Sequence, residues 1–268
     1  MAKSKKQSSK VSFAKPPLIE VVCGVQFETV EKFQVAHIGR LWNELGDTYT
    51  QSREVMALVA PIELIPGIEP PKIVVTPSLM PRTILIASDN GSIVQVQRDA
   101  FYRNWQRKGS DDTYPRYEFV IERFEEELEI FNRFISNNEL GIIKPIQFEL
   151  TYLNEVPLTI ESKVLKDAFW DSTAHKVLPE PEVINLVSQF LLPGAEGRLS
   201  TTFRNLVNQK GEPVFHWSLT VRGCTNPRSD MSLENLRKWF DNAHTWIVSA
   251  FTDLSEENCQ QKEWERQS

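Results

Sequence analysis

Two stretches of the chain, near residue 20 and near residue 150, alternate apolar with polar side chains. In the first, one face carries Ile19, Val21, Cys23, Val25 and Phe27, and the other carries Glu20, Gln26 and Glu28. In the second, Ile146, Phe148, Leu150 and Tyr152 lie opposite Gln147, Glu149, Thr151 and Glu155. A period of two residues is that of a β-strand with one buried face. We therefore predict a strand at each place.

Other stretches carry apolar residues at helical spacing. Residues 31–45 predict a helix that ends at Gly46, and residues 161–170 predict a weaker counterpart. One long helix is predicted behind start signals at Asp112, Thr113 and Pro115, from Tyr117, Ile121, Phe124, Leu128, Phe131 and Ile135. A second is predicted behind Asp230 and Ser232, from Leu233, Leu236, Phe240, Ala243, Ile247, Phe251 and Leu254.

Two tight turns predict β-hairpins. Asn90-Gly91 joins the β-rich runs 82–88 and 92–105, and Lys210-Gly211 joins 198–208 to 212–223. Each hairpin precedes a long helix. Because hairpin strands are antiparallel, we expect a mainly antiparallel sheet with the long helices on one face.

The order of these features occurs twice. Strand, helix, Pro-Gly segment, hairpin and long helix follow one another at a nearly constant separation, matching Glu20 with Glu149, Pro66-Gly67 with Pro193-Gly194 and Gly91 with Gly211. We predict an α+β fold of two similar strand-helix-hairpin-helix repeats, at residues 13–140 and 141–256. A ligand site is then expected in a groove between the repeats or on an uncovered face of the sheet.

The ends of the chain differ from its body. Residues 1–12 hold Lys3, Lys5, Lys6 and Lys10 without an apolar run, which predicts a disordered basic tail. Residues 257–268 predict a polar tail that frays or docks through Trp264. The sequence shows neither a secretory signal nor an apolar run of membrane length, so we expect a cytoplasmic protein.

Composition narrows the class of partner. The chain has 268 residues, 41% hydrophobic and 25% charged, which is ordinary for a globular protein. Its net charge is −6 and, without the four tail lysines, −6 − 4 = −10, which disfavours nucleic acid. Cys23, Cys224 and Cys259 have no CxxC spacing, so we expect buried thiols rather than disulfides or a zinc site. No metal or cofactor is expected.

Candidate chemistry is sparse, because the sequence contains no nucleophile elbow, phosphate loop, dinucleotide fingerprint or HExxH motif. His244 follows Asp241 by three residues, a spacing at which the carboxylate could orient the imidazole as a general base. His244 also borders the apolar stripe of its helix. We favour a structural histidine at the edge of the core, with the catalytic role as the alternative.

The segment from Arg98 to Lys108 interleaves aromatic and basic residues. As a strand it places Phe101, Arg103 and Trp105 on one face, which could stack on a base and bind its phosphate. His216 lies in the matching aromatic and basic segment of the second half. The alternative, which we favour, is ordinary hairpin packing with solvated arginines.

Three further residues are binding candidates. Tyr152 and Asn154 end the second predicted strand, where they line a groove or simply form a turn. Arg116 lies at the start of the first long helix, whose free NH groups attract anions, although such a start is more often only capping. The acidic run Glu125–Glu127 with Glu129 is interpreted as the solvated side of that helix.

Four segments carry a family resemblance: PPLIEVVCGVQF, YPRYEF, LTYLNEV and the terminal NAHTWIVSAFTDLSEE with its Trp-containing tail. Together they resemble a sporadically distributed prokaryotic family of uncharacterised proteins, over nearly the whole chain. The resemblance implies a bacterial or archaeal cytoplasmic protein of patchy occurrence, as in accessory or defence-type systems. It brings no catalytic residues.

A scaffold without a recognisable reacting group favours a non-enzymatic module that binds a small molecule or a protein partner, or that assembles. The first alternative is an enzyme acting on a nucleotide or other phosphorylated substrate, which Arg103 and Trp105 bind while His244 moves a proton. The second is nucleic-acid binding through the lysine tail and the same aromatic face.

Overall fold

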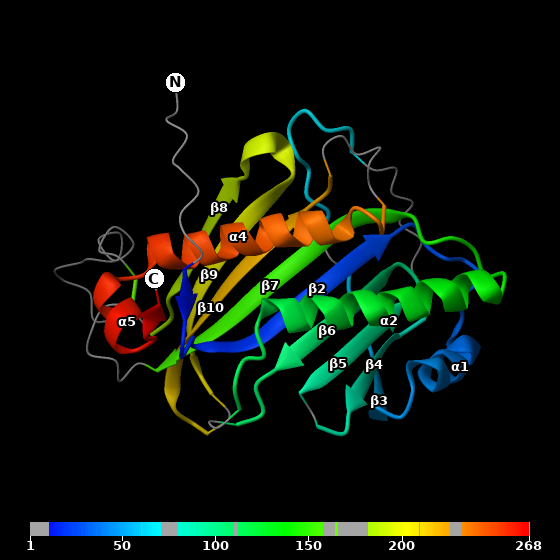
Figure 1. Ribbon diagram of the computed structural model, residues 1–268, viewed down its shortest axis with the longest axis horizontal. Helices are drawn as coiled ribbons and strands as arrows, with labels where there is room; N and C mark the ends of the chain where they lie inside the picture. The colour runs from blue at the N-terminus through cyan, green and yellow to red at the C-terminus, as the bar shows by residue number, and fades with distance from the viewer. Residues whose placement is uncertain are drawn as a thin grey trace.

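An antiparallel sheet of nine strands, counted over the described residues, forms the body of the protein (Figure 1). The computed structural model describes residues 11–59, 61–70, 80–89, 91–109, 112–157, 164–165, 182–208, 210–225 and 232–267. The strands are β2 (Leu18–Phe27), β3 (Tyr49–Val55), β4 (Arg82–Ala87), β5 (Ser92–Gln97), β6 (Ala100–Gln106), β7 (Pro145–Pro157), β8 (Asn185–Leu191), β9 (Gly197–Val207) and β10 (Pro213–Gly223). They lie in the order β3-β4-β5-β6-β2-β7-β10-β9-β8.

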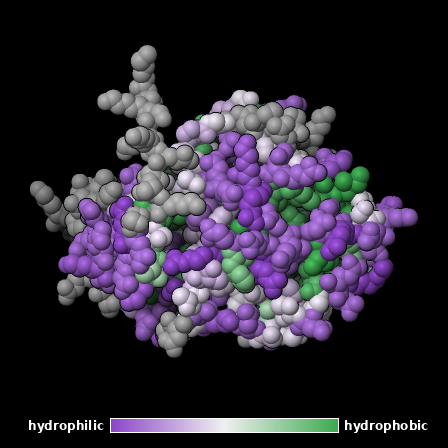
Figure 2. All heavy atoms as spheres, in the orientation of Figure 1, coloured by the Kyte–Doolittle hydropathy of each residue, from purple (hydrophilic) through white to green (hydrophobic). Residues whose placement is uncertain are grey.

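The long helices cover one face of this sheet, which confirms the predicted α+β class and layering. They are α2 (Tyr117–Asn137) and α4 (Leu236–Leu254), and both lie in front of the strands in Figure 1. The shorter helix α1 (Val35–Leu45) ends at Gly46 as predicted and packs beside α2. Hydrophobic atoms show mainly between and beside α2 and α4, whose outer surface is mostly hydrophilic (Figure 2).

The core lies between the helices and the paired central strands β2 and β7. Val21, Cys23 and Val25 are fully buried on the helix side of β2, as their alternation predicts. Aromatic rings join the layers, with Phe101 of β6 stacked 5.3 Å from Phe131 of α2. Burying each such side chain stabilises the fold by about 1.5–3 kcal/mol.

The inward position expected for Ile19 is wrong. A register shift between β2 and β7 at Leu18 and Glu20 reverses the alternation there, so Leu18 is buried and Ile19 only half-buried. Such an irregularity depends on how the strand pairs with its neighbour, so the alternation of residues within the strand alone cannot predict it.

The single run expected over residues 92–105 is two strands. Arg98 and Asp99 form a turn between β5 and β6, which pair antiparallel. The turn at Gly91 therefore joins β4 to β5, whereas Gly211 joins β9 to β10, beside the centre of the sheet. The hairpin next to β2 is β5–β6 and the hairpin next to β7 is β9–β10, so Gly91 and Gly211 lie at different places in the sheet. A glycine turn is conspicuous in a sequence, and Arg98-Asp99 is not.

The face of the sheet away from the helices is polar, and the chain crosses it. Gln97 of β5 accepts a hydrogen bond from the Leu58 NH and donates one to the Leu58 carbonyl. Gln147 of β7 accepts from the Glu63 NH and donates to the Pro61 carbonyl. We call residues 58–59 and 61–65 the crossing segment. Beyond β7, Arg198 of β9 pairs with the Glu63 carboxylate at 3.1 Å.

Both ends of the described chain are held together. Strand β1 (Ser12–Phe13) pairs antiparallel with β11 (Arg266–Gln267), which follows the short helix α5 (Glu257–Lys262). Trp264 is buried, with its ring 4.8 Å from that of Phe251 and 6.3 Å from that of Phe13. Of the two expectations for the C-terminal segment, docking through Trp264 is the one confirmed. The expected disordered tail, residues 1–12, extends too far, because Ser12 lies in β1.

Some predictions fall outside the described residues: the lysines of residues 1–10, most of the helix at 161–170, and the start signal Asp230. Within the described residues no helix is long and apolar enough to cross a membrane. The three cysteines are buried thiols, as expected.

Candidate functional site

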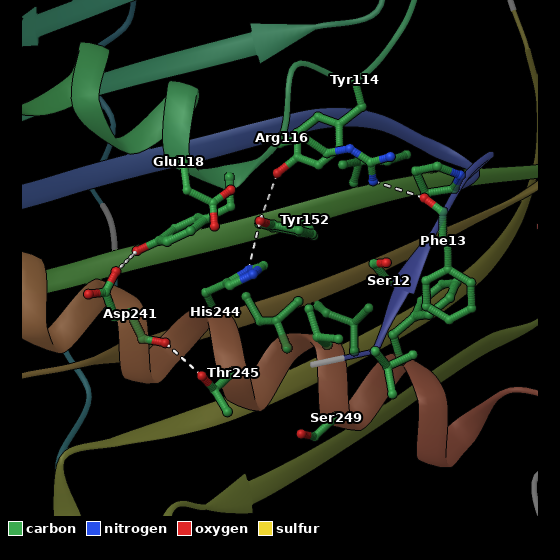
Figure 3. Close-up of a pocket in the computed structure, with 18 of the residues that line it drawn as sticks. Ser12, Phe13, Tyr114, Arg116, Glu118, Tyr152, Asp241, His244, Thr245 and Ser249 are labelled. Carbon is green, nitrogen blue, oxygen red and sulfur yellow. Dashed lines mark hydrogen bonds between the residues drawn. The ribbon is translucent and has the colours of Figure 1, made fainter. Parts of the chain in front are cut away.

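A cavity of about 600 Å³ lies between α4, the start of α2 and the helix-covered face of the sheet. Polar side chains in its lining include Tyr114, Arg116, Tyr152, Asn154, Asp241 and His244. Apolar ones include Phe13, Leu18, Leu219, Ile247, Val248 and Phe251. Figure 3 shows Asp241 and Glu118 at one end, Ser12 and Phe13 at the other, and His244 with Tyr152 between them. The lining comes from both halves of the chain.

Hydrogen bonds link three of these residues into a chain across the cavity. The hydroxyls of Tyr114 and Tyr152 lie 3.0 Å apart, and the Tyr152 hydroxyl lies 3.0 Å from Nδ1 of His244 (Figure 3). Strand alternation places Tyr152 of β7 on the helix side of the sheet. His244 faces it from the edge of the buried stripe of α4, one residue after Ala243 and three before Ile247.

Tyr117 supports the imidazole from the other side. Its ring stacks on that of His244, with centroids 4.1 Å apart and planes 2° apart. Its hydroxyl donates a hydrogen bond of 2.9 Å to Oδ1 of Asp241. The spacing suggested that Asp241 orients His244; the structure places Tyr152 at Nδ1 of His244 and joins Asp241 to the phenol of Tyr117.

The three phenols stay protonated at neutral pH. Burial raises the pKa of Tyr114 and of Tyr152. Burial also raises the pKa of Tyr117, and its hydrogen bond to Asp241 raises it further. A protonated phenol both donates and accepts hydrogen bonds, so these groups can fix the orientation of a polar ligand. They do not supply a phenolate base or nucleophile.

Arg116 lies at the rim of the cavity in an unusual backbone conformation. As the N-cap of α2 it has φ 79° and ψ 160°, a region used almost only by glycine. Holding another residue there costs of order 1–3 kcal/mol, and such outliers cluster at binding and active sites. Its Nη1 donates a hydrogen bond of 2.9 Å to the Phe13 carbonyl, which holds β1 over the cavity. The expected start signals Asp112, Thr113 and Pro115 do not cap this helix.

Arg103 does not belong to an open binding face. Its side chain is only 1% exposed, because the face of β6 that carries Phe101 and Arg103 is the one covered by α2. The guanidinium Nε lies 3.3 Å from Oε2 of Glu127. The prediction of a stacking surface is therefore wrong, and so is the alternative of solvated arginines at this position.

Glu127 corrects the interpretation of the acidic run. It is buried on the sheet side of α2, where it also accepts a hydrogen bond of 2.6 Å from the Tyr49 hydroxyl. Glu125 pairs with Arg237 and so joins α2 to α4. Of the four acidic residues in this run, only Glu126 and Glu129 are largely solvated. One turn of a helix brings Glu127 to the face opposite its neighbours in sequence.

Of the remaining binding candidates, Asn154 lines the cavity, and Trp105 and His216 lie outside it. Trp105 is buried behind the cavity, its ring 5.2 Å from that of Tyr114. His216 lies on the crossing-segment face of β10, with Nε2 3.2 Å from a carboxylate oxygen of Glu155. Asn154 donates to the Trp217 carbonyl. It lies within β7, which continues to Pro157, so the turn expected at Tyr152 and Asn154 is absent.

Arg116, Tyr152, Asn154 and His244 therefore meet at one cavity, and Arg103, Trp105 and His216 do not line it. Sequence reasoning missed Phe13, which no pattern distinguishes, and the roles of Tyr114 and Tyr117, which flank Arg116. Among the described residues, no group of three or more His, Cys, Asp or Glu side chains is arranged to hold a metal ion.

No protein-family model matches the sequence, and a search among curated proteins found no match either. The resemblance to a sporadic prokaryotic family therefore stays a prediction.

Proposed function

We propose that the protein is a non-enzymatic binding module that holds a small amphipathic molecule in the cavity between α4 and the start of α2. The observation that carries this proposal is the cavity itself, whose volume of about 600 Å³ lies within the range of small-molecule sites. Apolar side chains and a few convergent polar groups line it together. That combination is typical of sites that bury a ligand and orient it.

The polar groups favour binding over catalysis. Tyr114 and Tyr152 are held by each other and by His244, so their hydroxyls are preorganised to meet a polar group of the ligand. The charged side chains of the lining carry both signs: Arg116 and Arg237 are positive, and Glu118 and Asp241 are negative. A ligand with a small polar group and an apolar body fits this lining better than a multiply charged phosphate.

The enzyme hypothesis loses the arrangement that motivated it. It needs Arg103, Trp105 and His244 to converge on one substrate, yet Arg103 is paired with Glu127 beneath α2. His244 lines the cavity without Arg103 or Trp105. An enzyme using His244 would instead have to bind its substrate through the arginines of the lining, Arg116 and Arg237.

The two-copy organisation is part of the same proposal. In the sheet, β6 and then β5 lie outward from β2, and β10 and then β9 lie outward from β7. Along the chain, α2 comes after β6 and α4 comes after β10. We propose that this likeness reflects a duplication. The cavity would then be a site formed once, where the two copies meet.

A pocket-filling variant tests the binding proposal. Val248 lines the cavity from α4, so Val248→Trp should fill it, whereas Val59→Trp places the same side chain at an 88% exposed position on the opposite face. Candidate ligands come from two experiments: native mass spectrometry of the protein purified from its host, and a thermal-shift screen of small molecules. A true ligand at 100 times its Kd should stabilise the wild type and V59W by about 2.7 kcal/mol, and V248W hardly at all.

Two results would contradict the proposal. One is a ligand that stabilises V248W as much as the wild type, since its site is then elsewhere. The other is turnover of a bound molecule that His244→Ala removes, which would establish an enzyme.

A further inference from the structure

The two edges of the nine-stranded sheet differ in how they are protected. β3 and β8 are the edge strands of the described sheet. An edge strand exposes unpaired backbone NH and CO groups, and charged residues, bulges or proline normally keep other strands away. β3 has such protection in Arg53, Glu54 and a register shift near Tyr49. β8 has none: residues 183–191, VINLVSQFL, contain no charge and no proline.

The side chains along this edge are unusually apolar for a surface. Val183 is 77% exposed, Val187 56% and Leu191 47%. These three alternate with Asn185 and Gln189, which are also exposed, on the side of β8 away from the helices. Ile184, Leu186 and Ser188 are half-buried on the other side. The edge therefore offers both backbone hydrogen-bonding groups and an apolar row beside them.

The sequence of β8 is complementary to itself. In an antiparallel pairing centred on Val187, that residue faces its own copy, Asn185 faces Gln189, and Val183 faces Leu191. On the helix side, Ile184 faces Phe190. Leu186 faces Ser188, which is the one pair of an apolar with a polar side chain. In the other pairs apolar side chains meet apolar ones and amides meet amides, and since no charge is present, no like charges are opposed. A centre at Ser188 would instead place Val187 against Gln189.

We propose that β8 pairs with β8 of a second copy of this chain, antiparallel and centred on Val187, to form a two-fold symmetric dimer with one continuous sheet. Pairing an edge with its own copy satisfies the backbone groups of both chains and leaves β3 as the outer edge. The cavity draws no lining residue from β8. The dimer is thus independent of the proposed ligand site.

Charge reversal at the symmetry axis tests this pairing. In sedimentation velocity over about 1–100 µM chain, the wild type should approach twice the protomer mass of 30.9 kDa. Val187→Lys and Val187→Glu each place like charges opposite one another and should be monomeric. Mixing the two variants should restore the dimer. The control Gln51→Lys, an exposed change on β3, should leave the wild-type dimer intact.

Cysteine cross-linking tests the register. Directly opposite side chains have Cβ atoms about 4.5–5.5 Å apart, so Val187→Cys should form an intermolecular disulfide on oxidation with little adjustment. Asn185→Cys faces Gln189 and should not form one. The native thiols are buried and should give little background. A wild type that stays monomeric throughout, a dimer that persists in both charged variants, or faster linking of N185C than of V187C would overturn the proposal.

Discussion

Arg103 and Glu127 share a buried site under α2. Burial raises the pKa of the Glu127 carboxyl, and Arg103 and the Tyr49 hydroxyl act against that rise. When the folded pKa of an acid exceeds its unfolded value of about 4.3, its contribution to stability falls as pH increases through that range. Arg103 limits this loss of stability, since its guanidinium lies 3.3 Å from the carboxylate and lowers its pKa.

Removing Arg103 should therefore make stability strongly pH-dependent. Arg103→Met leaves Glu127 buried without its counter-charge, which costs about 3–5 kcal/mol where the carboxyl must ionise. We expect the free energy of unfolding of R103M, measured in urea, to fall further below that of the wild type as the pH rises from about 5 to about 8. The double variant R103M/E127Q keeps an acceptor for Tyr49 and should lose the pH dependence.

Arg133→Met is the matched control, because Arg133 and its partner Glu129 are solvated. It should change stability by less than about 1 kcal/mol. Equal pH dependence in R103M and R103M/E127Q would show that Glu127 is not the titrating group.

The crossing segment is held at the scale of elements, by side chains of the sheet rather than by strand pairing. Gln97 and Gln147 each bind backbone groups of the segment with both atoms of their amide, so they take the place of a neighbouring strand. Gln147 also donates to Gln26, which ties the contact to β2. The apolar Val59 and Leu64 of the segment stay exposed, at 88% and 67%. Ile65, at the end of the segment, is buried at 5%, so the attachment depends on these amides together with that one side chain.

Gln147→Leu should release the crossing segment before the sheet unfolds. The change removes the hydrogen bonds to Glu63 and Pro61, and each lost partner costs about 1–3 kcal/mol if the group stays buried. Hydrogen exchange followed by mass spectrometry should show faster exchange of the crossing segment, with the amides of β2 and β7 still protected.

The exposed Gln51 of β3 offers the matched control, since Gln51→Leu makes the same chemical change away from the segment. If both variants leave exchange of the crossing segment unchanged, the glutamines do not hold it in place.

At the scale of the whole molecule, the two ends of the described chain close the cavity together. Phe13 forms part of the cavity wall and packs against Phe251 and Trp264. Ala14 and Lys15 donate backbone hydrogen bonds to the carbonyls of Glu265 and Trp264. Trp264 itself does not line the cavity. The shape of the site thus depends on residues at both ends of the sequence.

Trp264→Ala should loosen this closure. Deleting a buried tryptophan side chain costs about 3–5 kcal/mol, here at the contact between the chain ends. We expect faster amide exchange at Ala14 and Lys15 and, for any ligand found, a weaker affinity, while the central strands stay protected. Uniformly faster exchange throughout the sheet would show that the tryptophan supports the whole fold and not the closure alone.

Local patterns were enough to predict the central strands and the long helices. Val21, Cys23 and Val25 repeat every second residue, and Ile121, Phe124 and Leu128 recur at helical spacing. These periods follow from backbone geometry, which is the same in every protein. His244, Tyr152 and Arg116 were also within reach of sequence reasoning, because polar residues beside an apolar stripe or at an element end are few.

The sequence by itself determined which side chains share a face, and only the tertiary structure decided what covers each face. Arg103 was placed correctly with Phe101, yet its role was reversed because α2 covers that face and brings Glu127 to it. Likewise, nothing local marks Phe13 as a wall of the cavity, since the contact that puts it there joins the two ends of the chain. Periodicity is a property of neighbouring residues, whereas burial and the closing of a cavity depend on contacts between segments far apart in sequence.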